Sequence, residues 1–70
     1  MSVMKITKNN YTQEVLESNV PVLIDFFADW CMPCKMFGPI VDEVAAAHEG
    51  KVKVVKINID DDPELAQEYR

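Results

Sequence analysis

The chain has 70 residues, of which 49% are hydrophobic and 27% charged, and its formal net charge is −5 at pH 7. This length fits one small domain, 1–70, with no linker or internal repeat. A negative chain without a basic stripe argues against nucleic-acid binding. No apolar run is long enough to span a bilayer and no leader-like stretch precedes the first predicted strand, so we expect a soluble, cytoplasmic protein without a membrane partner.

The first half of the sequence predicts a strand, a helix and a second strand. Residues 3–7 form the first strand. Asn10 is placed to cap the helix that follows, whose buried side chains are then Tyr11, Val15 and Leu16. Residues 22–28 form a strand that is apolar on both faces, as expected in a parallel sheet covered by helices, and Asp25 is its one charged residue.

The second half repeats the alternation. A helix is expected from about Cys31 to Glu49, with Pro39 inside it, and the three- and four-residue spacing of its apolar residues predicts a face packed on the sheet: Phe37, Ile40, Val41, Val44 and Ala45. Residues 52–59 form the third strand, and Asp62 and Pro63 then begin a third helix. Three strand–helix units in sequence predict an α/β fold with a parallel sheet and right-handed crossovers.

The only two cysteines, Cys31 and Cys34, are separated by Met32 and Pro33 at the junction between the second strand and its helix. The start of a helix offers free backbone N–H groups and a partial positive charge, so it stabilises the Cys31 thiolate. Cys34 lies one turn later on the same face, and Pro33 suits a first helical turn. This spacing predicts a reversible disulfide, with Cys31 attacking a substrate disulfide and Cys34 resolving the mixed disulfide.

Asp25 lies six residues before Cys31 in a strand that is otherwise apolar. Burial of a carboxyl group raises its pKa, so Asp25 is a candidate to accept the proton that Cys34 loses. Lys56, in the third strand, is the available cationic neighbour, although a lysine there is more often a strand residue whose ammonium reaches solvent.

The residues around the cysteine pair resemble a known family. The run Trp30 to Lys35, with Phe26 to Asp29 before it and Pro39 after it, is similar to the active-site region of a thioredoxin, and the resemblance extends from the first strand to Tyr69. It implies that Cys31 is the nucleophile, Cys34 the resolving thiol, Asp25 the proton-transfer group and Lys56 its partner. By the same resemblance Trp30 shapes the docking surface and Pro33 tunes the redox poise. The family carries electrons from a flavin-containing thioredoxin reductase to protein disulfides and needs no cofactor beyond its redox-active disulfide.

Two departures from the family stand out. Met32 replaces the usual glycine between the cysteines, which adds bulk beside the disulfide and removes backbone freedom. The cis-proline loop, the last two strands and the last helix of a thioredoxin have no counterpart here, so we expect a truncated domain: βαβαβα, with three parallel strands flanked by helices. In the family's strand order this leaves residues 22–28 at an apolar edge, which favours a fragment of a longer protein or a homodimer paired through that edge.

Other uses of the pair stay open. A thioredoxin fold could serve as a non-catalytic binding or structural module, or as a half-domain that assembles. A C-x-x-C pair is also half of a common zinc site, but no second pair of ligands is present, so zinc would have to be shared between two chains and we expect no metal within one.

Overall fold

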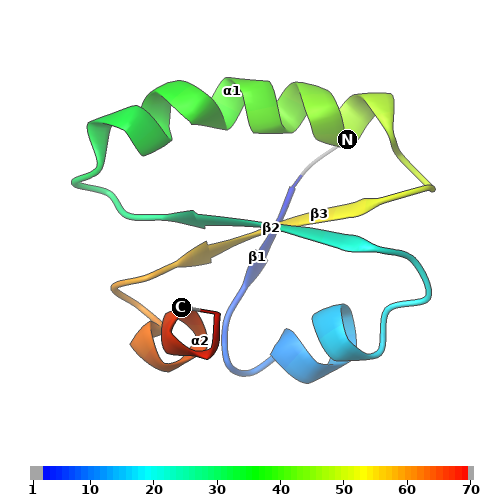
Figure 1. Ribbon diagram of the computed structural model, residues 1–70, viewed down its shortest axis with the longest axis horizontal. Helices are drawn as coiled ribbons and strands as arrows, with labels where there is room; N and C mark the ends of the chain where they lie inside the picture. The colour runs from blue at the N-terminus through cyan, green and yellow to red at the C-terminus, as the bar shows by residue number, and fades with distance from the viewer. Residues whose placement is uncertain (1–2, 70) are drawn as a thin grey trace.

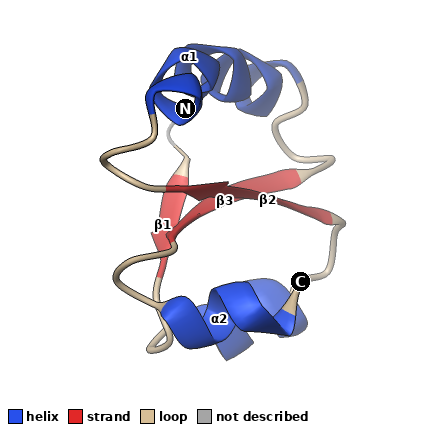
Figure 2. Cartoon of the chain, turned by 60° about the vertical axis from the view of Figure 1, so that its left-hand side comes forward, coloured by secondary structure: helices blue, strands red, loops and turns tan. Residues whose placement is uncertain are grey.

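The computed structural model describes residues 3–69; residues 1, 2 and 70 of the predicted domain lie outside this range. Its elements are β1 (Met4–Ile6), η1 (a π-helix, Thr12–Leu16), β2 (Val22–Phe27), α1 (Met32–Ala47), β3 (Lys53–Asn58) and α2 (Pro63–Glu68). The strands form one parallel sheet in the order β1–β3–β2. The helix α1 covers one face of this sheet, and η1 and α2 lie on the other (Figures 1 and 2). The predicted α/β fold is confirmed.

The middle strand β3 supplies both hydrophobic cores, because successive residues of a strand face opposite sides of the sheet. Val55 and Ile57 point away from α1 and pack with Ile6 and Leu65. Val54 points toward α1 and packs with two of its residues, Val41 and Ala45. Complete burial of such aliphatic side chains contributes roughly 1.5–3 kcal/mol each, so β3 is the strand that holds the two helical layers together.

The strand β2 lies at an edge of the sheet rather than at its centre. It pairs with β3 from Val22 to Phe27, and no second strand pairs with it among residues 3–69. None of its residues is fully buried. The predicted edge position is therefore correct, whereas the expectation of a strand buried on both faces is wrong.

The predicted first helix is only a five-residue π-helix, and Asn10 does not cap it. The Asn10 side chain instead accepts a hydrogen bond from the Thr7 N–H (2.8 Å) and donates one to the Lys5 carbonyl (3.2 Å). Tyr11 and Val15 pack against the core as predicted. Leu16 does not: it is 64% exposed. The asparagine fails as a cap because its amide is used to close the turn after β1.

The helix α1 contains Pro39, and the turn after it includes Gly50, at a φ of +87°. Of its predicted buried face, Val41 and Ala45 are covered, but Phe37 and Ile40 are 53% and 52% exposed. These two residues border the outer edge of β2, where no strand of residues 3–69 covers them. Together with Leu23 they line a largely apolar groove of about 160 Å³. No helix of the described range is long and apolar enough to cross a membrane.

Candidate active site

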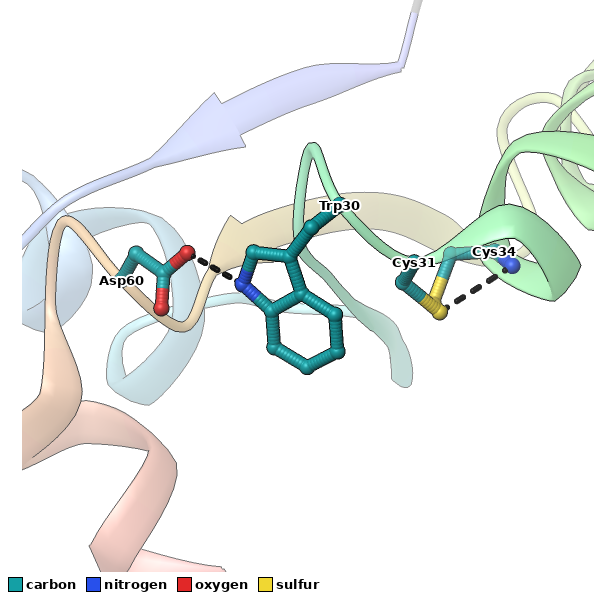
Figure 3. The surroundings of a disulfide bond; sticks show 4 residues. All are labelled: Trp30, Cys31, Cys34 and Asp60. Carbon is teal, nitrogen blue, oxygen red and sulfur yellow. Dashed lines mark hydrogen bonds between the residues drawn. A yellow bond between two sulfur atoms is a disulfide. The ribbon is translucent and has the colours of Figure 1, made fainter.

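Cys31 occupies the N-cap position of α1 and forms a disulfide with Cys34. The two Cα atoms lie 5.3 Å apart. The Sγ atom of Cys31 accepts a hydrogen bond from the Cys34 N–H, with an N–S distance of 3.3 Å (Figure 3). The first turn of the helix therefore directs a backbone donor at the sulfur, as predicted, and this donor and the helix dipole both favour a thiolate once the disulfide is reduced.

The turn before α1 is set by local hydrogen bonds. The Cys31 N–H donates to the Ala28 carbonyl (3.1 Å), and the Cys31 carbonyl accepts from the Lys35 N–H (3.2 Å) as the first bond of the helix. Pro33 lies in the first turn, where its missing N–H leaves no helical bond unmade. The chain therefore passes from strand to helix at Cys31 without a glycine.

The two residues next to Cys31 in sequence, Trp30 and Met32, are large, apolar and 68% and 64% exposed. Trp30 is held in place, because its Nε1–H donates to Asp60 Oδ2 at 2.7 Å (Figure 3). Asp60 is fixed in turn by the buried Asn58, whose Oδ1 accepts from the N–H of Asp60 at 2.9 Å. The loop after β3 thus positions the indole beside the disulfide.

Behind the disulfide, a cavity of about 240 Å³ contains the two predicted charged residues. Asp25 and Lys56 face each other directly in the register of β2 and β3, and both line the cavity together with Cys34. The cavity can hold several water molecules, each of which occupies about 30 Å³ in the liquid. Asp25 and Cys34 thus share a space through which a proton can pass by way of water.

Asp25 is only partly buried, although the sequence predicted a buried carboxyl group. Burial nevertheless raises the pKa of its carboxyl group above the ordinary value of 3.8, and the nearby charge of Asp42 adds to this increase. The charge of Lys56 lowers the same pKa. The net increase makes Asp25 a better proton acceptor than a surface aspartate.

Of the predicted site residues, Trp30, Met32 and Pro33 are exposed next to the cysteines in sequence, and Asp25 and Lys56 line the cavity that Cys34 also lines. Within residues 3–69, no cluster of three or more His, Cys, Asp and Glu side chains is arranged to hold a metal ion.

Two contacts were not predicted from the sequence. Asp60 binds Trp30 across 30 positions of sequence, and no local pattern signals such a pair. The Lys56 ammonium lies 5.4 Å from the centroid of the Phe27 ring. For Phe27 a signal did exist, because in a strand it shares a face with Asp25, two residues earlier.

A parallel α/β sheet with a C-x-x-C disulfide at the start of the helix after an edge strand defines a class of redox-active domain. The comparisons with known proteins specify the class further. The family model Thioredoxin matches residues 2–70. A thioredoxin 1 from a Nostoc species is 54% identical over 65 residues, which are 93% of this chain and 61% of the relative. A thioredoxin from Pyropia yezoensis is 54% identical over 69 residues, 99% of this chain and 64% of the relative.

The chain belongs to the thioredoxin family. A thioredoxin from Thiocapsa roseopersicina is also similar, at 46% identity over 97% of this chain and 75% of that protein. The chain spans about three fifths of the length of the Nostoc and Pyropia relatives. Thioredoxins use the redox-active disulfide itself and no further cofactor.

Proposed function

We propose that the chain is a thiol-disulfide oxidoreductase that reduces protein disulfides through Cys31 and Cys34. The observation that carries this proposal is the position of Cys31, at the N-cap of α1 with its sulfur accepting a backbone N–H. In the reduced protein the Cys31 thiolate attacks one sulfur of a substrate disulfide. A mixed disulfide forms, and the other substrate sulfur leaves as a thiolate and is protonated.

The second step needs a proton acceptor for Cys34. Its thiol gives its proton to the Asp25 carboxylate through the shared cavity, and the Cys34 thiolate then attacks Cys31 Sγ. The mixed disulfide breaks, the second substrate thiolate is released, and the Cys31–Cys34 disulfide forms. Two electrons have then passed from the dithiol to the substrate, and Asp25 has to release its proton before the next turnover.

The same proposal includes the partners and the compartment. Protein disulfides are the substrates, thioredoxin reductase returns two electrons to the Cys31–Cys34 disulfide, and the chain works in the cytoplasm. The cytoplasm is a reducing compartment, where a cysteine pair is more often redox-active than permanently bridged, so this location agrees with the proposed reductase activity. Trp30 and Met32 directly precede and follow Cys31 in the sequence, and both are exposed. They form the apolar surface that binds the substrate.

Insulin reduction by dithiothreitol tests the proposal. The wild-type chain should accelerate the precipitation of reduced insulin chains, and Cys31→Ser should abolish the acceleration. Cys34→Ser is the matched control, since it keeps the nucleophile and should accumulate a mixed disulfide with insulin that mass spectrometry detects. Equal rates for the wild-type chain and Cys31→Ser would refute the reductase assignment.

A second candidate function is assembly through the edge of β2. The unpaired backbone of this strand lies beside the apolar groove formed by Leu23, Phe37 and Ile40. An exposed apolar edge strand is a template for pairing with another chain. We propose that a second copy of the chain pairs through Val22–Phe27, which would make the domain a binding or structural module as well as a reductase.

A further inference from the structure

Lys56 has two partners within reach on one face of the sheet. In β2, Asp25 and Phe27 are two residues apart and therefore face the same side. Lys56 in β3 lies directly opposite Asp25, and Phe27 lies opposite Asn58, two residues after Lys56. The lysine ammonium can therefore bind either the carboxylate of Asp25 or the aromatic face of Phe27. All three side chains line the cavity behind Cys34.

The ammonium lies over the ring. Its Nζ atom is 5.4 Å from the Phe27 centroid, inside the limit of about 6 Å for a cation–π interaction. Within residues 3–69, the ion pairs closer than 4 Å are Lys5 with Asp61 and Lys53 with Glu14. Asp25 and Lys56 thus face each other in register without forming a closed ion pair.

We propose that Phe27 is a positioning residue for the disulfide-exchange reaction: its ring binds the Lys56 ammonium and prevents it from closing an ion pair with Asp25. This inference rests on the proposed reductase function and names a residue that acts on the proton acceptor indirectly. A closed pair would stabilise the carboxylate and make it a weaker acceptor for the Cys34 proton. With the ammonium on the ring, the effect of burial on Asp25 prevails.

Three other charged groups lie near Asp25. Asp29 and Lys35 line the same cavity, and Asp42 acts on Asp25 from α1. Two of them are carboxylates, and the cation that lies over the Phe27 ring is Lys56 rather than Lys35. A change in the titration of Asp25 that depends on both Phe27 and Lys56 therefore reports the ring–ammonium contact itself.

The test is the titration of the Asp25 carboxyl carbon by NMR in the oxidised protein, where neither thiol titrates. Phe27→Leu should move the Asp25 midpoint to lower pH, because the released ammonium approaches the carboxylate. Phe27→Trp keeps an aromatic face and should leave the midpoint at the wild-type value. Lys56→Met should move the midpoint to higher pH, and in that background Phe27→Leu should have no effect.

Two results would overturn the inference. One is an unchanged or raised midpoint in Phe27→Leu, and the other is an equal shift with and without Lys56, which would mean that the leucine acts through solvation. If Phe27→Leu does not fold, Phe27→Ile is measured in the same two backgrounds. The titration needs no turnover, so a wild-type chain that fails to reduce insulin would refute the reductase proposal and leave this measurement intact.

Discussion

The edge of β2 gives the most direct prediction, because the exposed fractions of its side chains set the expected magnitude. Leu23, Phe37 and Ile40 are 45%, 53% and 52% exposed. Since complete burial of such side chains is worth roughly 1.5–3 kcal/mol each, covering the exposed 45% of Leu23 contributes about 0.7–1.4 kcal/mol per copy. Leu23→Lys removes this contribution from both copies of a symmetric dimer and places a charge on the edge. The dimer dissociation constant should therefore rise about 10- to 100-fold.

Sedimentation velocity over a concentration series measures this change. Leu16→Lys is the matched control, because Leu16 is the same residue type and is also exposed (64%, against 45% for Leu23) but lies in η1, outside the groove. It should leave the dissociation constant unchanged. A wild-type chain that stays monomeric at every concentration and unfolds cooperatively would refute the reasoning, and so would equal effects of the two lysine substitutions.

Three further predictions concern the site and the core. Burial raises the pKa of Asp25 above its ordinary value of 3.8. Ionisation of Asp25 is therefore less favourable in the folded protein, and stability falls as the pH rises from 3.8 through the folded-state pKa. Asp25→Asn should have a higher free energy of unfolding in urea than the wild-type chain at pH 7, and the same free energy below about pH 3.5. Asp60→Ala should lower the fluorescence anisotropy of Trp30, the chain's only tryptophan, and lower the free energy of unfolding by about 0.5–1.5 kcal/mol. Asp60→Asn keeps a hydrogen-bond acceptor and should retain most of the anisotropy and of the stability. No difference between the two variants would exclude the hydrogen bond. Ile57 is fully buried, so Ile57→Ala should lower the unfolding free energy by about 2–5 kcal/mol, and a loss below 1 kcal/mol would contradict its central place in the core.

Local sequence signals predicted most of the fold. The strand around Asp25, the helix that starts after Cys31 and the helix that starts at Pro63 each follow from periodicity, a cap or a proline, and each was found. The C-x-x-C pair was correctly predicted to lie at the start of the helix after the second strand, because the two cysteines are separated by only one helical turn. The edge position of β2 followed from the family's strand order, not from the residues of the strand.

Two of the incorrect predictions arise because periodicity identifies the apolar face of a helix but not what covers that face. Phe37 and Ile40 continue the apolar face of α1, yet they lie beside an edge where no strand of the described range covers them. Asn10 carries a capping signal, but its amide is used by Thr7 and Lys5. The Trp30–Asp60 bond joins two loops, and its prediction would require the packed sheet.

The reactive pair and the apolar edge are parts of one continuous surface, and this connects the two proposed functions. Phe37 lines the groove beside β2 and also an open pocket that reaches Pro33 and Cys34. A strand that covers the groove therefore comes close to the resolving cysteine, Cys34. A second copy bound there would restrict access to the disulfide, because the same aromatic ring borders both places. Assembly and turnover are then expected to compete, and the monomer is the species in which Cys31 is most accessible to a protein substrate.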